Sequence, residues 1–267
     1  MSYVDSFLDR DRDIIHVVER VNGERQYREY PAKYTMYYPD DRGAFTSIFG
    51  DKLDRVVCNS GRKFNTEKKM HGHKGLFESD INPVFRCLAD NYMDAEAPEL
   101  HIGFFDIEVD FNKNKGFAPP EDPFNAITAI ALHLSWLNRT ICLTIKPDTL
   151  SKEEAQAICE KFDDTILFDT EEELLGAFLE LSDDVDVFTG WNSEGFDIPY
   201  IVNRISRILS KSHTRKFCLW DKFPKAKTIV KFGKESETYD LAGRVHLDML
   251  ELYRKYTYHE MHSYSLD

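Results

Sequence analysis

The stretch GFFDIEVDF, residues 103–111, decides the fold and raises a question about charge. It places two carboxylates, Asp106 and Glu108, two residues apart inside a largely apolar run. Side chains along a strand alternate between its two faces, so both acids are predicted to point to the same face. Like charges side by side on a half-buried strand repel each other and are costly to remove from water. The stretch therefore calls for a partner that compensates both charges.

The 267-residue chain has the composition of an ordinary globular protein, with 42% hydrophobic and 30% charged residues. No run approaches the roughly 18 apolar residues of a transmembrane helix, so no membrane contact is expected. The N-terminal stretch MSYVDSFLDRDRDIIHVVER lacks the apolar segment of a signal peptide. Five widely spaced cysteines without a CxxC motif favour reduced thiols in a cytoplasm over a disulfide framework.

The charge of the chain is unevenly distributed. The net charge of −13 argues against a general nucleic-acid-binding scaffold, which is usually basic. However, residues 146–190 hold three basic and fourteen acidic side chains, whereas residues 200–234 hold ten basic and one acidic. The basic segment is compatible with a local phosphate-binding surface and equally with a solvated face.

Two domains are predicted, a smaller mixed domain over residues 1–100 and an α/β domain over residues 101–267. In the first, an apolar strand, the turn Asn22-Gly23 and a second strand predict a hairpin. A helix is predicted to start after Asn82-Pro83, and DAEAPEL reads as a linker. From residue 100, three neighbouring strands precede alternating helices and strands. This pattern predicts a mixed central sheet.

A second informative stretch is FTGWNSEGFDIPYIVNR, residues 188–204. It reads as a strand end, a polar turn and a helix, with Asp197 at or near the helix start. One interpretation makes Asp197 an N-cap with Pro199 in the first turn, and Asn192 an ordinary turn residue. The other follows from topology, because strand ends and the starts of following helices gather at one edge of an α/β sheet.

That topology predicts that Asp106, Glu108 and Asp197 come together. No Lys or Arg lies near them in the sequence, so a divalent metal would supply the positive charge. Mg²⁺ prefers carboxylate oxygens and keeps water and phosphate as its other ligands. Two such ions about 4 Å apart are a standard arrangement for phosphodiester hydrolysis.

Together, FFDIEV and the later FTGWNSEGFDIPYI resemble exonuclease motifs I and II of family B DNA polymerases. GLFESDINPVFRCLADNY and LDMLELYRKYTYHEMHSYSLD resemble flanking segments in the replicative polymerases of myovirus-type tailed phages. The resemblance implies a ribonuclease H-like exonuclease domain over residues 101–267 that removes mispaired 3′ nucleotides. Residues 1–100 would be the N-terminal domain of that family.

The resemblance also implies roles for the three acids and a cofactor. Asp106 would bridge two Mg²⁺ or Mn²⁺ ions. Glu108 would bind the ion that activates water, and Asp197 would hold the second ion largely through water.

Contacts with DNA are implied in the same way. Asn192 and Phe196 would shape the pocket around the terminal nucleotide. Phe117 would pack against the terminal bases, with a loop anchor as the alternative interpretation. The segment KAKTIVKFGKESETYDLAG resembles the hairpin that helps to separate primer from template. Its lysines suit phosphate contact, although lysines also protect a solvated edge hairpin; they are Lys225, Lys227, Lys231 and Lys234.

The family pattern has a fourth carboxylate, in Tyr-x-x-x-Asp on a later helix. Here that spacing occurs only at Tyr37 and Asp41, around Pro39 and ahead of motif I. We therefore expect little nuclease activity from this chain alone. We also expect it to be part of a polymerase, either as a fragment or as a split subunit.

The expected partners are the 3′ end of single-stranded or primer-template DNA, the remainder of the polymerase and accessory proteins such as a sliding clamp. The expected location is the cytoplasm of an infected host cell. Two alternatives remain open, a stand-alone ribonuclease H-like nuclease and a non-catalytic DNA-binding or regulatory module.

Overall fold

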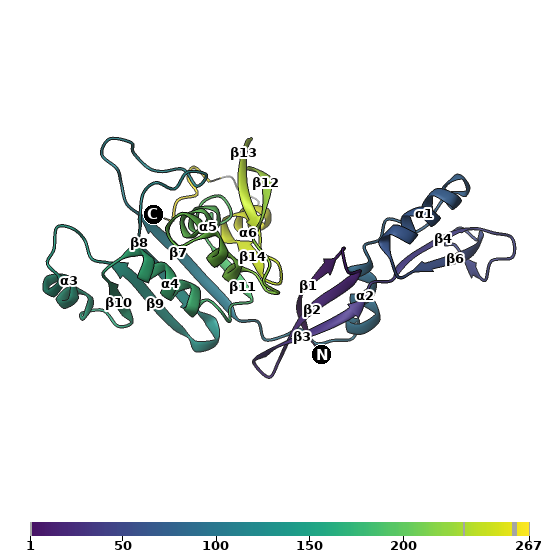
Figure 1. The fold of residues 1–267 in the computed structure, drawn as a ribbon, viewed down its shortest axis with the longest axis horizontal. Helices are drawn as coiled ribbons and strands as arrows, with labels where there is room; N and C mark the ends of the chain where they lie inside the picture. Colours follow the sequence, from purple (N-terminus) through teal and green to yellow (C-terminus); the bar gives the residue numbers. More distant parts are fainter. Residues whose placement is uncertain (1, 232, 258–260, 267) are drawn as a thin grey trace. The chain divides into compact units, whose positions relative to one another are not determined.

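The computed structural model describes residues 2–231, 233–257 and 261–266. Contacts between Cα atoms divide the chain into two compact units, Met1–Glu99 and Leu100–Asp267 (Figure 1). Each unit has a core of its own and is described by itself.

The first unit combines two small antiparallel sheets with two helices. Strands β1 (Tyr3–Asp9), β2 (Ile14–Val21) and β3 (Glu24–Pro31) form one sheet. Strands β4 (Tyr34–Pro39), β6 (Lys52–Cys58) and β5 (Phe45–Thr46) form the other, in the order β4-β6-β5. Helix α1 (Gly61–His71), a short 3₁₀ turn (Gly72–Lys74) and α2 (Pro83–Tyr92) complete it.

Both elements predicted for this unit are confirmed. Asn22 and Gly23 adopt positive φ angles of 53° and 80°, and their turn joins β2 to β3. Asn82 caps α2 by accepting a hydrogen bond from the Val84 N–H, and Pro83 is the first helical residue.

The second unit is built on a six-stranded mixed sheet. Its spatial order is β10 (Thr165–Phe168), β9 (Arg139–Ile145), β8 (Ile127–Leu134), β7 (Ile102–Val109), β11 (Val187–Gly190) and β14 (Val245–Asp248). Neighbours among β7, β8 and β9 are antiparallel, whereas β11 and β14 run parallel to β7 and β10 runs parallel to β9. This mixed α/β arrangement is that of a ribonuclease H-like domain and confirms the predicted fold class.

Helices α4 (Glu171–Leu181) and α5 (Asp197–Ile208) pack on one face of this sheet (Figure 1). The others are α3 (Lys152–Cys159) and α6 (Met249–Tyr256), with 3₁₀ turns at Ser135–Leu137 and Lys211–Phe217. Strands β12 (Lys225–Lys231) and β13 (Lys234–Asp240) form a separate hairpin beside α5.

Local sequence explains where the helices lie. Reciprocal capping boxes at Ser151 with Glu154 and at Thr170 with Glu173 start α3 and α4. Helix α5 places apolar residues at helical spacing toward the sheet; Ile198, Ile201, Val202 and Ile205 are all buried. Each fully buried side chain of this size contributes about 1.5–3 kcal/mol to the stability of the fold.

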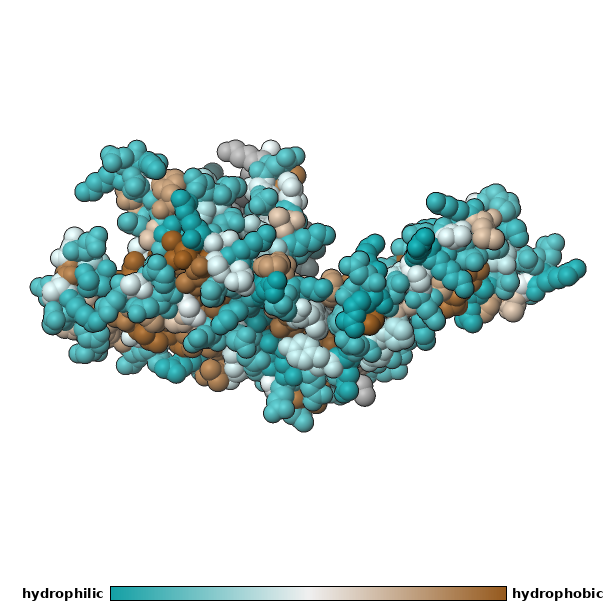
Figure 2. Space-filling view, in the orientation of Figure 1, coloured by the Kyte–Doolittle hydropathy of each residue, from teal (hydrophilic) through white to brown (hydrophobic). Residues whose placement is uncertain are grey.

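Polar and charged side chains dominate the surface that Figure 2 shows, with small apolar areas between them. Within the described part of the chain, no helix is both long and apolar enough to span a bilayer.

Candidate active site

Strand β7 presents its two acids on its open face, as predicted. Buried and exposed residues alternate along the strand. Gly103, Phe105 and Ile107 are buried, while Phe104, Asp106 and Glu108 are exposed. The acids stand opposite two small residues of β8, since Asp106 pairs with Ala131 and Glu108 with Ala129. These alanines leave room beside the carboxylates, and the ladder becomes irregular directly after Glu108.

The third acid lies at the edge of the same strand. The residue pairing of β11 with β7 ends at Phe104, short of the end of β7. The Ile107 N–H donates to Asp197 Oδ1, at 3.2 Å. The two carboxylates Asp106 and Asp197 therefore flank the same short piece of backbone.

The geometry excludes one interpretation of Asp197. Helix α5 begins at Asp197 itself, Phe196 is the N-cap, and no side chain caps the helix. The N-cap interpretation is therefore wrong, and the carboxylate of Asp197 instead bonds to the strand. Gly190, at the end of β11, allows β11 to lie close to β7, because a Cβ there would stand 2.5 Å from the Phe105 carbonyl oxygen.

The charges of this cluster oppose one another. Asp197 is only 4% exposed. Its burial, and then the charges of Asp106 and Asp248, raise its pKa to about 7. Burial also raises the pKa of Asp106, even though this side chain lies on an open face.

Sequence reasoning missed Asp248, the buried acid at the end of β14. Its carboxylate accepts hydrogen bonds from the Leu250 N–H, at the start of α6, and from the Glu194 N–H, in the turn before α5. The available signal was an acid at the junction of a predicted strand with a helix, where Asp248 is the N-cap of α6.

The turn between β11 and α5 holds the two residues expected around the terminal nucleotide. Asn192 adopts a left-handed φ of 56° and folds its amide over Gly195, where a Cβ would stand 2.8 Å from Asn192 Oδ1. The ring of Phe196 packs at 5.2 Å from that of Tyr200. The turn is tied to β14 by a 2.9 Å bond between Ser193 Oγ and His246 Nε2.

Phe117 lies in the loop between β7 and β8, which continues from the acids. Its side chain is 71% exposed and meets the half-exposed ring of Phe111 edge-on, at 4.9 Å between centroids. Other residues anchor the loop. Tyr200 Oη donates to the Asn125 carbonyl and Arg204 donates to the Pro123 carbonyl, both from α5. Phe111 and Phe117 therefore form an exposed aromatic pair on this loop.

The hairpin lysines differ in their surroundings. Lys225 is exposed. Lys227 forms ion pairs within the protein, at 2.9 Å with Asp240 and 3.3 Å with Glu194. Lys231 and Lys234 face each other across the hairpin, and their side chains lie outside the described set.

The donor set suits a hydrated divalent ion. Among the described residues, no three His, Cys, Asp or Glu side chains already converge as a ready-made metal site. Mg²⁺ does not require such convergence, because it usually keeps several waters and binds through one or two carboxylates. The pKa of Asp197 is raised first by burial and then by the charges of neighbouring acids, and a bound cation would relieve this unfavourable charge.

Comparison with known proteins places this site in a family. The model of the family described as "DNA polymerase family B, exonuclease domain" matches residues 64–267. The DNA-directed DNA polymerase of Escherichia phage RB69 is 28% identical over 272 aligned positions, covering 92% of this chain and 30% of the phage protein. That of Enterobacteria phage T4 is 36% identical over 102 residues, covering 38% of this chain and 11% of the phage protein. The chain thus spans less than a third of either relative, and it belongs to the family B DNA polymerases through their exonuclease domain.

Proposed function

We propose that the chain is the N-terminal and proofreading 3′–5′ exonuclease portion of a replicative family B DNA polymerase. It would hydrolyse the 3′-terminal phosphodiester of DNA. The observation that carries the proposal is that Asp106 and Glu108 lie on the open face of β7 while the buried Asp197 bonds to the same strand, where the charge of Asp106 opposes its own.

Asp106, Glu108 and Asp197 would hold two divalent ions, Mg²⁺ or Mn²⁺. When bound, such ions activate water and stabilise the leaving oxygen in phosphodiester hydrolysis. The Ile107 N–H orients the Asp197 carboxylate, and the hydrogen bond that the Glu194 N–H donates to Asp248 fixes the turn that presents it. Ala129 and Ala131 leave the face beside Asp106 and Glu108 open to the substrate.

The substrate would be a single-stranded 3′ end. Phe117 and Phe111 would stack on its bases, Asn192 and Phe196 would bound the terminal nucleotide, and Lys225 would contact phosphate. The remainder of a polymerase and accessory proteins such as a sliding clamp would be its partners. It would act in the cytoplasm of an infected host cell.

The test is metal-dependent binding of a 3′ end, measured by fluorescence anisotropy of a labelled single strand in Mg²⁺ and in EDTA. We expect Mg²⁺ to strengthen binding and Asp106→Ala to abolish that gain. Asp110→Ala changes a nearby exposed acid directly after the same strand and is the matched control, expected to keep the gain. Binding that is indifferent to Mg²⁺, or a gain that survives Asp106→Ala, would refute the proposal.

A further inference from the structure

Asn203 in α5 bonds to both the Phe117 loop and the β12–β13 hairpin. Its Nδ2 donates to the Pro120 carbonyl at 2.8 Å, in the loop that carries Phe117. Its Oδ1 accepts from Tyr239 Oη at 2.6 Å, in strand β13 of the hairpin. One side-chain amide therefore holds both the Phe117 loop and the hairpin.

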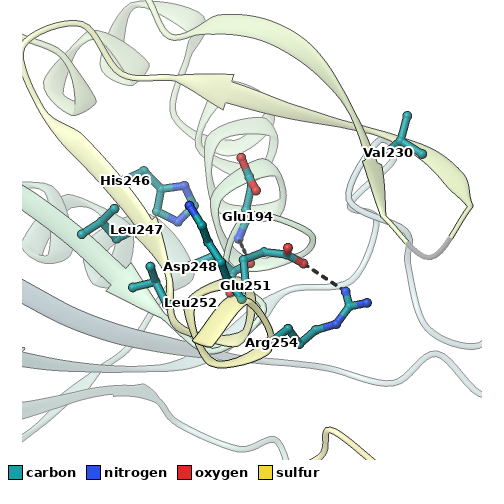
Figure 3. A pocket seen from close by; sticks show the side chains of 9 residues that line it. Glu194, Val230, His246, Leu247, Asp248, Glu251, Leu252 and Arg254 are labelled. Atoms are coloured by element: carbon teal, nitrogen blue, oxygen red, sulfur yellow. Dashed lines mark hydrogen bonds and ion pairs between the residues drawn. The ribbon is translucent and has the colours of Figure 1, made fainter. Parts of the chain in front are cut away.

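A second contact fixes the other strand of the hairpin. Lys227 of β12 pairs with Glu194 in the turn before α5, and the Glu194 N–H donates to Asp248. Figure 3 shows this last bond and places Val230 of the hairpin across from it. Glu194 and Val230 both line a cavity of about 580 Å³. The hairpin is thus held by Glu194, which precedes Asp197, and by Asn203, which follows it.

These contacts make the segment 194–203 a common frame. Its middle presents the Asp197 carboxylate, one side holds the hairpin, and Asn203 also holds the Phe117 loop. A shift of the hairpin relative to the loop must break the Asn203 bonds or move α5. Since α5 is packed into the core of the unit, the bonds are the weaker element.

We propose that Asn203 is a positioning residue for the 3′ end. Its amide sets the spacing between the hairpin and the Phe117 loop. A DNA strand held between them then places its 3′ end at one fixed position relative to Asp106 and Asp197. The inference rests on the proposed exonuclease function and adds a residue that contacts neither the acids nor the expected nucleotide.

Variants of the chain separate bracing from folding. Tyr239→Phe removes only the hydroxyl that bonds Asn203, and Asn203→Ala removes both bonds. Arg207→Gln is the matched control. Arg207 lies one turn further along the same helix and pairs with Asp122 of the same loop at 2.8 Å, in an exposed position.

Two measurements are made on each variant. Hydrogen exchange of the β12 and β13 amides reports on bracing. Anisotropy with a labelled single-stranded 3′ end in Mg²⁺ reports on positioning. Loss of one hydrogen bond predicts exchange and dissociation constants that rise roughly 2- to 10-fold in Tyr239→Phe and at least as much in Asn203→Ala. Arg207→Gln should stay within about twofold of the parent, as removal of an exposed ion pair predicts.

The outcomes are distinct. Unchanged hairpin exchange in Tyr239→Phe would overturn the brace, whether or not Asn203→Ala folds. Faster exchange with unchanged affinity for the 3′ end would overturn the positioning role. If the parent chain itself binds no 3′ end, the exonuclease function fails. If it binds and the Tyr239 and Asn203 variants match Arg207→Gln, this inference alone fails.

Discussion

The buried carboxylate of Asp197 should make the second unit less stable as the pH rises in the absence of metal. In the folded state its pKa is about 7, raised from 3.8 by burial and by the charges of Asp106 and Asp248. Between these two values the unfolded chain ionises while the folded chain keeps its proton. Folding then binds a proton, so stability falls with rising pH and the loss is complete above pH 7.

The expected magnitude follows from the two pKa values. A rise from 3.8 to about 7 corresponds to about 4 kcal/mol of lost stability at pH 8, of which about 3 kcal/mol develops between pH 5 and pH 8. Asp197→Asn removes the charge and retains an oxygen that can accept the Ile107 N–H. The variant should therefore escape this loss, and its advantage over the parent should grow across that pH range.

The assay is thermal unfolding followed by tryptophan fluorescence. All three tryptophans, Trp136, Trp191 and Trp220, lie in the second unit, so the signal reports on that unit. For a unit of this size, about 3 kcal/mol corresponds to a difference in Tm of roughly 6–12 °C. Asp110→Asn changes an exposed acid directly after β7 and is the control. Its Tm difference from the parent should not grow between pH 5 and pH 8.

Added Mg²⁺ completes the test. A bound cation favours the ionised carboxylate, so Mg²⁺ at pH 8 should raise the Tm of the parent and leave Asp197→Asn nearly unchanged. An advantage of Asp197→Asn that stays constant between pH 5 and pH 8 would refute the account of the buried charge. An equal response of both proteins to Mg²⁺ would refute the assignment of Asp197 as a metal-binding acid.

Three further substitutions test other parts of the account. Arg204→Met should cost about 3–5 kcal/mol in urea unfolding, because it leaves the buried Glu171 carboxylate without its two-point partner; a cost below 1 kcal/mol would contradict this. Phe117→Ala should weaken binding of single-stranded DNA by about 1–3 kcal/mol in anisotropy with an unchanged Tm, and unchanged affinity would remove Phe117 from the DNA surface. Gly190→Ala should lower stability by about 1–3 kcal/mol in urea unfolding, because its Cβ would meet the Phe105 carbonyl; a fully stable variant would show that the strands separate freely.

The sequence predicted the parts of the site that depend on local pattern. Alternation along β7 placed Asp106 and Glu108 on one face, because the apolar residues Phe105 and Ile107 alternate with them and face the core. The turn at Asn22-Gly23 and the cap at Asn82 follow from backbone conformations that only a few residue types support. These features need no knowledge of distant parts of the chain.

The remaining features arise from contacts between distant segments. The bond from the Ile107 N–H to Asp197 exists because β11 stops short of the end of β7, and no local pattern gives that length. The sequence alone treated Lys227 as one of four similar lysines, and only the fold brings Glu194 and Asp240 to it. Asp248 reaches the turn before α5 through the parallel pairing of β11 with β14.

The most direct measurement of the central claim is a titration of the chain with Mn²⁺, with free ion followed by electron paramagnetic resonance at pH 8. Asp106, Glu108 and Asp197 predict saturable binding that competes with Mg²⁺. Asp106→Ala and Asp197→Asn should each weaken it at least tenfold, while Asp110→Asn leaves it unchanged. Absence of saturable binding in the parent chain, or equal binding in all four proteins, would contradict the assignment of these acids as the metal site of an exonuclease.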